Sequence, residues 1–233
     1  MVWVKSMRRR AFGWLLMLSI SALPGSGWSW HDETHLAIAR AAGYSKWYNA
    51  AGADITKIKA GDVEVKNHYV GNPPETVASA QMVLDQVVRY NDSHDQKGHL
   101  YGAIIAAIRE YQLAPRKGKY AQYHLAFCAH YAGDLSQPLH NLHYNDYNQR
   151  YHTATDGIIE NEVLNNLPLI RIYSITIRSE ADLAAEIAKI ANLSMKLGGQ
   201  LEKEGRLMTR QEAYRQISHS ASLLKAILQF IER

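Results

Sequence analysis

Apolar residues recur at intervals of three and four along most of this chain, and stretches in which apolar and polar residues alternate are few. An interval of three to four residues is the period of an amphipathic helix, whereas strands repeat every two. The pattern therefore predicts an all-α protein, folded as a single-domain bundle of helices. The predicted helices are 34–42, 75–90, 99–111, 120–135, 152–165, 180–204 and 210–231, and residues 170–177 are the one candidate for a short strand.

Several predicted helices carry recognisable ends. Asn72-Pro-Pro-Glu75 is a start signal for the second helix, because proline is tolerated in the first helical turn. Thr209 can cap the last helix, and Glu212 three residues later completes a capping box. Pro138 forbids a helix to continue, so the helix that begins near residue 120 is expected to stop and turn before it.

The first 29 residues are typical of a secretory signal peptide. Four basic residues within the first ten precede the apolar run 11–20, which is too short to span a bilayer as a helix. The small residues Gly27 and Ser29 predict cleavage after Ser29, which leaves Trp30 as the new amino terminus and residues 30–233 as the domain. The alternative is an uncleaved anchor. We expect export to the periplasm or secretion.

The charge of the chain is concentrated in this leader. The whole chain has a formal net charge of +4 and a pI of about 9.0. The leader holds four of the 26 basic residues and no acid, so 22 basic residues face 22 acidic ones in the remainder. The excess charge therefore indicates no nucleic-acid patch. The single cysteine, Cys128, leaves no internal disulfide, and we expect it to be a small buried apolar group.

Two histidine and aspartate pairs carry the candidate chemistry. His130 and Asp134 are four residues apart, so both project from one face of a helix and can hold one ion. The turn after this helix brings His140 back toward the same centre, while His152 and Asp156 repeat the four-residue spacing. Neutral nitrogen together with anionic oxygen suits zinc. The motifs predict a zinc site for one ion or two neighbouring ions.

With these motifs the chain resembles the superfamily of zinc-dependent phospholipase C and the single-strand-specific zinc nucleases. The resemblance spans nearly all of residues 30–233 and is carried, in order, by Trp30, His35, His68-Tyr69, His130, Asp134, His140, His152 and Asp156. It implies an all-helical fold that holds three zinc ions (Zn2+) in a cleft. It also implies hydrolysis of a phosphodiester.

The resemblance assigns ligands to each of the three ions. The first zinc takes Asp54, His68, His130 and Asp134; the second takes His140, His152 and Asp156; the third takes the amine and carbonyl of Trp30 with His35 and Asp134. Asp62 also precedes His68 and is the alternative to Asp54.

Asp54 and Asp134 are the catalytic residues that the resemblance implies. Asp134 bridges two ions, and Asp54 orients or deprotonates the attacking water. The sequence contains no nucleophile elbow and no glycine-rich phosphate loop, and it needs no Ser-His-Asp arrangement. Direct attack by water therefore fits better than a covalent intermediate.

The same ligand set serves enzymes that cut phospholipids and enzymes that cut single-stranded nucleic acid. A phospholipase C-like activity is the first prediction, because the chain lacks a basic excess and disulfides, and because Glu33 can face a cationic head group. A single-strand-specific endonuclease or 3′-nucleotidase is the alternative, in which Tyr69 stacks on a base and Lys57 contacts a phosphate. His143 stands where the phospholipase pattern has an asparagine, and it is a candidate to hydrogen-bond a metal ligand.

A third hypothesis is a non-catalytic periplasmic protein that holds its ions in closed structural sites. No stable protein partner is implied, and we expect a monomer. The remaining histidines match no ligand position and are expected at the surface or in packing: His31, His94, His99, His124 and His219.

Overall fold

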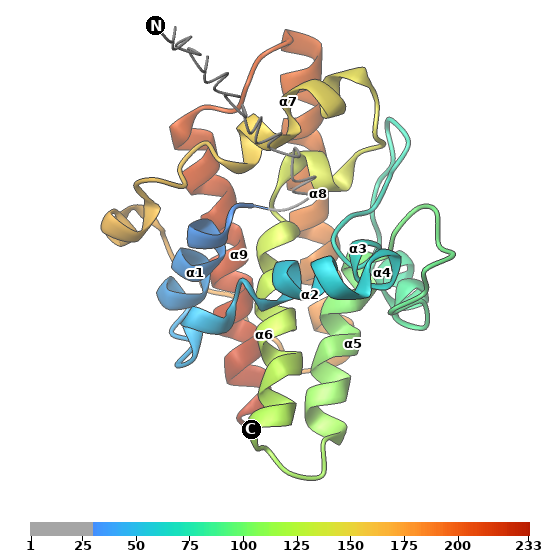
Figure 1. Cartoon of the computed structure of the whole chain (residues 1–233), viewed down its shortest axis with the longest axis vertical. Coiled ribbons are helices and arrows are strands. Elements are labelled where there is room, and N and C mark those ends of the chain that lie inside the picture. Colours follow the sequence, from blue (N-terminus) through green and yellow to red (C-terminus); the bar gives the residue numbers. More distant parts are fainter. Residues whose placement is uncertain (1–29) are drawn as a thin grey trace, which may run out of the picture.

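The structure is a computed structural model that describes residues 30–233 (Figure 1). Its helices are α1 (Asp32–Ala41), α2 (Gly52–Ala60), α3 (Asp62–Val65), α4 (Ala80–Val87), α5 (Leu100–Leu113), α6 (Lys119–Asp134), α7 (Asp146–Asp156), α8 (Glu180–Glu204) and α9 (Arg210–Ile231). Short 3₁₀ turns are η1 (Trp47–Asn49), η2 (Pro138–Asn141), η3 (Val163–Asn165) and η4 (Leu167–Leu169). The predicted signal peptide and its cleavage site lie outside the described residues.

The all-α prediction is confirmed, because residues 30–233 contain no β-strand. The two longest helices, α8 and α9, begin and end at the predicted residues. The capping box at the start of α9 is formed as predicted, since the Thr209 side chain accepts from the N–H of Glu212 and the Glu212 side chain accepts from the N–H of Thr209. Strong local signals at both ends of these helices explain the agreement.

Helices α1, α5 and α6 begin within two residues of the predicted position, but α4 and α7 begin farther from it. The start signal that ends in Glu75 was wrong, because Glu75 lies in a turn with φ of 64° and α4 begins only after Ser79. The Ser79 hydroxyl accepts from the N–H of Met82 at 3.2 Å, which makes it the cap. The helix expected over 152–165 is α7, which begins earlier because Asn145 caps it, and ends at Asp156.

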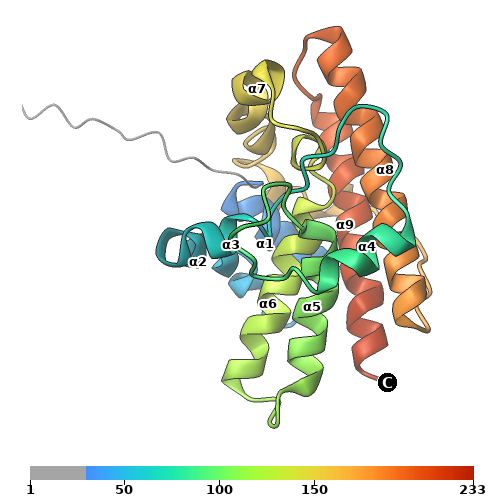
Figure 2. The same cartoon turned by 90° about the vertical axis from the view of Figure 1, so that its right-hand side faces the viewer.

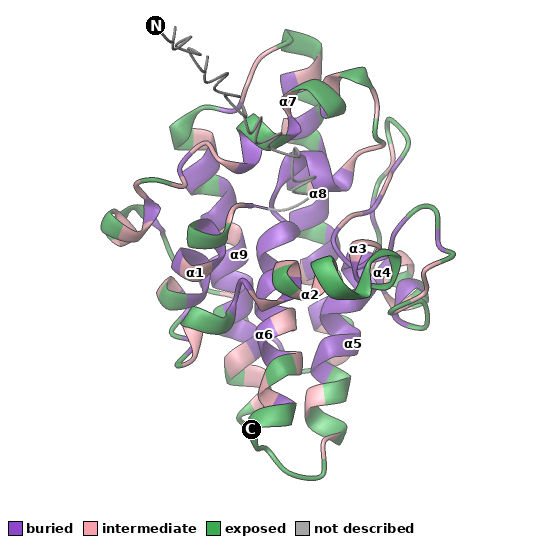
Figure 3. Cartoon of the chain, in the orientation of Figure 1, coloured by how far each residue is buried: buried purple, intermediate pink, exposed green. Residues whose placement is uncertain are grey.

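Helices α2 and α3 were not predicted from the sequence. Both are short, and short isolated helices are marginal without tertiary contacts. Helix α2 exposes Ile55 and Ile58, which are 63% and 80% accessible, so its apolar residues do not mark a buried face (Figure 3). Packing of α2 against α6 and α3 supports it instead.

The short strand expected at residues 170–177 is absent from the described chain. This segment is extended, but it lies along α9 rather than beside another strand. The main-chain N–H groups of Arg171 and Tyr173 donate to the hydroxyls of Ser218 and Ser222, at 2.9 and 2.8 Å. Helix side chains therefore satisfy donors that a sheet would otherwise pair.

Helix α6 runs through the middle of the molecule, with α5 antiparallel beside it and the long α8 and α9 pair behind (Figures 1 and 2). Helices α1, α2, α5 and α9 all pack against α6. Its carboxyl-terminal half, which ends at Asp134, is almost entirely buried (Figure 3). The last two turns of α6 thus present their side chains inside the protein, where neighbouring helices can reach them.

Cys128 is fully buried on α6, as expected, and burial raises the pKa of its thiol to about 12. The apolar clusters around it join residues from α4, α5, α6, α8 and α9. Within residues 30–233, no helix combines the length and the apolar character needed to cross a membrane.

Candidate metal centre

Six elements bring histidine and carboxylate side chains together around the end of α6. They contribute His35 from α1, Asp54 from α2, His68 from the turn after α3, His130 and Asp134 from α6, His140 from η2, and His152 and Asp156 from α7. All of them are buried except Asp54, whose side chain is 19% accessible. Three groups of these side chains could hold a metal ion.

Site A consists of Asp54, His68, His130 and Asp134. Nε2 of His130 lies 3.2 Å from Nδ1 of His68, 3.3 Å from Oδ2 of Asp134 and 3.6 Å from Oδ1 of Asp54. Nδ1 of His68 lies 2.9 Å from Oδ2 of Asp134 and 3.9 Å from Oδ1 of Asp54. The structure brings these four residues together, while the alternative acid Asp62 is exposed on α3.

Site B consists of His140, His152 and Asp156. The two Nε2 atoms of the histidines lie 3.2 Å apart. Oδ2 of Asp156 lies 3.4 Å from Nε2 of His152, and Oδ1 lies 3.9 Å from Nε2 of His140. The amide of Gln137 donates a short hydrogen bond to Oδ1 of Asp156, which fixes that carboxylate.

Site C contains His35 and Asp134. Nε2 of His35 lies 3.4 Å from Oδ1 of Asp134. His130 also falls within this group, stacked on the His35 ring at 3.7 Å, but its Nε2 already faces site A. The Trp30 side chain is fully buried, and the next N–H, that of His31, donates to the Asp156 carbonyl at 3.5 Å. The chain at residues 30–31 is therefore held beside the metal-capable groups.

Hydrogen bonds to the outward nitrogen orient two of the histidines. Nδ1 of His130 lies 2.8 Å from the Ala50 carbonyl, and Nδ1 of His152 lies 2.6 Å from Oδ1 of Asn148. Each acceptor keeps a proton on Nδ1, so that Nε2, once it carries no proton, directs a lone pair into the group, which is the arrangement that metal-binding histidines use.

The donor separations fit a tetrahedral ion. Zinc binds nitrogen and oxygen at about 2.0–2.2 Å, which places neighbouring ligand atoms of a tetrahedron roughly 3.3–3.6 Å apart. The donor separations in sites A and B run from 2.9 to 3.9 Å. A mixed set of imidazole nitrogens and carboxylate oxygens is also the donor set that zinc takes in proteins.

The charges within the centre are unequal. Burial by itself lowers the pKa of His130, but the carboxylates of Asp54 and Asp134 outweigh burial and raise it to about 9. Burial lowers the pKa of His152 to about 4 and holds that of His140 well below its usual value. The histidines of site B are thus neutral at pH 7, while His130 in site A holds a proton that a cation must displace.

Glu64 is the residue of this centre that the sequence analysis missed. It is buried on α3, where Oε1 accepts from the Tyr131 hydroxyl at 2.5 Å and lies 3.4 Å from Nε2 of His68. Asn67 donates to its other oxygen at 3.2 Å. The four-residue spacing of Glu64 and His68 was the available signal, but it begins in α3, a short helix that the sequence pattern did not predict.

His143 does not hydrogen-bond a metal-capable side chain, contrary to the sequence expectation. Its Nε2 contacts the amide of Asn145 at 3.2 Å, and Asn148 holds His152 instead. Of the other histidines, His99 is buried between Asp95 and Asn67, at 3.2 and 2.8 Å, which is a packing role. His94 is exposed, and His31, His124 and His219 are half-buried.

The three residues predicted to contact a substrate, Lys57, Tyr69 and Glu33, lie at different places around the centre. Nζ of Lys57 lies 2.6 Å from Oδ1 of Asp54, so its charge is directed to site A. Tyr69 lines a cavity of about 350 Å³ with Tyr144, next to Leu139 and Asn148, which adjoin site B. Glu33 is exposed at the start of α1, and its N–H donates to Glu160 at 2.7 Å.

Comparison of the chain with models of protein families, with curated proteins and with solved structures gave no match.

Proposed function

We propose that this protein is a zinc-dependent hydrolase that cleaves phosphodiester bonds. The observation that carries the proposal is the position of Asp134, whose Oδ2 belongs to site A and whose Oδ1 lies 3.4 Å from His35 and 3.5 Å from Nδ1 of His140. One carboxylate between neighbouring metal-capable groups is the arrangement that hydrolases with paired ions use on phosphate esters.

Zinc bound in adjacent sites would lower the pKa of a water molecule toward 7 and neutralise charge on the phosphate. Asp134 would keep the sites at a fixed separation. Asp54 is the most accessible residue of site A and would hydrogen-bond the attacking water. Burial alone would raise the pKa of Asp54, but His130, Lys57 and His68 hold it well below its usual value, which suits Asp54 for orienting water rather than for accepting its proton.

A phospholipid is the first candidate substrate. Helix α2 carries Asp54 and, on the same short helix, the exposed Ile55 and Ile58. Exposed isoleucines together with the exposed Lys59 suit contact with the apolar and phosphate layers of a lipid surface. Such contact would bring head groups to the accessible edge of site A.

Single-stranded nucleic acid is the second candidate, favoured by the cavity beside site B. Tyr69 and Tyr144 share its wall with Lys97. Phenol rings take the faces of unpaired bases, and a lysine takes a phosphate. The hydroxyl of Tyr69 accepts from Lys66 at 3.0 Å, which fixes the ring.

A paired hydrolysis assay tests the proposal. The protein starting at Trp30 is loaded with zinc and given phosphatidylcholine vesicles or single-stranded DNA, each with a chelated control. Chelator-sensitive release of phosphocholine supports the phospholipase activity, and chelator-sensitive cutting of DNA supports the nuclease. If neither substrate is hydrolysed while three zinc ions are bound, the result would contradict the proposal and favour closed structural zinc sites.

A further inference from the structure

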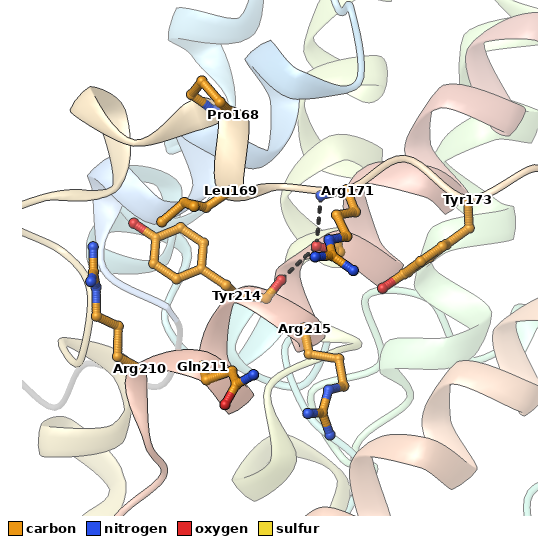
Figure 4. A pocket seen from close by; sticks show the side chains of 9 residues that line it. Pro168, Leu169, Arg171, Tyr173, Arg210, Gln211, Tyr214 and Arg215 are labelled. Carbon is orange, nitrogen blue, oxygen red and sulfur yellow. Dashed lines mark hydrogen bonds between the residues drawn. The ribbon is translucent and has the colours of Figure 1, made fainter.

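A second hollow lies away from the metal centre, between the first half of α9 and the segment from η4 to Tyr173 (Figure 4). It has a volume of about 530 Å³. Three arginines and two tyrosines dominate its wall. The lining residues are Pro168, Leu169, Arg171, Tyr173, Arg210, Gln211, Tyr214, Arg215 and Ser218.

Two of the three arginines have no carboxylate partner in the described part of the chain. Arg210 is paired with Glu162 by a short contact, and Tyr214 also donates to Glu162 at 3.2 Å. Arg171 and Arg215 are exposed, and neither forms an ion pair within residues 30–233. The hollow therefore carries two uncompensated positive charges on opposite walls, one from the extended segment and one from α9.

The hydroxyl of Ser218 joins the extended segment to α9. The N–H of Arg171 donates to Oγ of Ser218 at 2.9 Å, and Ser218 donates to the Tyr214 carbonyl at 2.6 Å (Figure 4). Arg171 and Tyr173 are two residues apart on an extended segment, so they share one side of it. The Tyr173 ring is braced by His219 at 5.2 Å. The main chain at Arg171 and the ring of Tyr173 are thus held in place on α9.

This hollow is separate from the metal centre. Tyr214 and Ile170 belong to an apolar cluster with the buried Trp30, and that cluster fills the space between α9 and α1. A different face of α9 meets α6, where Ser220 donates to the Ala132 carbonyl next to the metal-capable turns. Helix α9 therefore has the metal centre on one side and the arginine hollow on another.

We propose that this hollow is a second phosphate-binding site, which holds the backbone of single-stranded nucleic acid through Arg171 and Arg215. Guanidinium groups form bidentate hydrogen bonds with phosphate oxygens. The exposed Tyr173 ring beside these cations can accept an unpaired base, as aromatic rings do in single-strand binding grooves, whereas Arg210 lies over the buried Tyr214 ring at 5.5 Å. A lipid surface requires a protruding apolar face, whereas these cations line a concavity.

The test measures binding rather than hydrolysis, so its outcome is independent of activity at the metal centre. A fluorescent oligothymidine with phosphorothioate linkages is titrated into the zinc-loaded protein at several salt concentrations. The variants are Arg171→Gln with Arg215→Gln, and the matched control Arg178→Gln, an exposed arginine on the same segment but outside the hollow. Melting temperatures confirm that all three proteins are folded.

Each lost phosphate contact on a single strand reduces the magnitude of the slope of log K against log salt by about 0.7. The slope of the double variant should therefore be about 1.4 smaller in magnitude, and its binding at 0.1 M salt roughly 25-fold weaker. The control should match the parent. Equal slopes for the double variant and the parent would overturn the proposal. Binding of vesicles of phosphatidylcholine and phosphatidylglycerol without binding of oligothymidine would also overturn it. The same holds if inorganic phosphate binds as tightly as the oligonucleotide.

Discussion

Oδ2 of Asp134 lies 2.9 Å from Nδ1 of His68, although 66 residues separate them in the chain. The second carboxylate oxygen of Asp134 faces the opposite way, toward His35 and His140. One fully buried side chain at the end of α6 thus connects the three metal-capable groups. Its negative charge also offsets the proton on His130 in the metal-free protein.

Asp134→Asn should remove more than one zinc ion per chain, because sites A and C both lose a charged oxygen. It should also destabilise the metal-free protein by about 3–5 kcal/mol, since His130 then keeps a buried charge with one partner fewer. Zinc per chain by atomic absorption and thermal melting with and without chelator measure the two effects. Full zinc content in the variant would contradict the assignment of Asp134.

Gly133→Ala should displace His35 and deplete site C. A β-carbon at Gly133 would lie 2.5 Å from Nδ1 and 2.8 Å from Cε1 of His35, closer than real contacts allow. We expect the loss of one zinc ion and a lower melting temperature. The matched control is Gly199→Ala in α8, where a β-carbon meets nothing within 4 Å. That variant should gain roughly 0.5–1 kcal/mol, as alanine does inside a helix.

Glu64→Gln should weaken zinc binding at site A by about 10- to 100-fold, because the carboxylate no longer orients His68 through Nε2. The control is Asp62→Asn on the same helix, an exposed acid that should leave zinc affinity unchanged. Competition with a chromophoric zinc chelator gives both affinities. A loss of zinc affinity in the Asp62 variant, with none in the Glu64 variant, would contradict the role of Glu64. It would also favour Asp62 over Asp54 as the ligand of site A.

A residue placed before Trp30 should cost the protein one zinc ion. A free α-amino group has a pKa of about 7.7–8.0, so zinc can displace its proton near neutral pH, but an amide nitrogen at the same place is no ligand. The protein starting at Trp30 is compared with one that carries Gly-Ser before Trp30 and one that carries Gly-Ser after Arg233. Equal zinc content in all three would show that the amine does not take part.

The difference in stability between the zinc-loaded and the metal-free protein should increase as the pH rises from about 6.5 to 9. The folded pKa of His130 is raised to about 9, so its charged form stabilises the metal-free fold fully below the unfolded value near 6.5 and loses that contribution as the pH approaches 9. Protons also compete with zinc for Nε2, so zinc binds more tightly over the same range.

Calorimetric melting of zinc-loaded and metal-free protein across this range measures the difference. His130→Asn removes the titrating group and should flatten the dependence. A gap between the two melting temperatures that narrows with rising pH would contradict the assignment of the proton to His130.

The sequence by itself determined the parts of this protein that depend on local spacing. A period of three to four residues predicted the all-α class, and the capping signal at Thr209 predicted the start of α9. The four-residue spacings predicted that His130 faces Asp134 and that His152 faces Asp156, because one helical turn decides both distances.

The tertiary structure alone decided which distant residues meet. The choice of Asp54 over Asp62 depends on how the unpredicted α2 packs on α6, and the contact of Glu64 with His68 depends on α3. The hollow with Arg171 and Arg215 exists because an extended segment lies on the hydroxyls of α9 instead of in a sheet. Such contacts join residues tens of positions apart, and packing across the core, rather than any periodicity in the chain, sets their geometry.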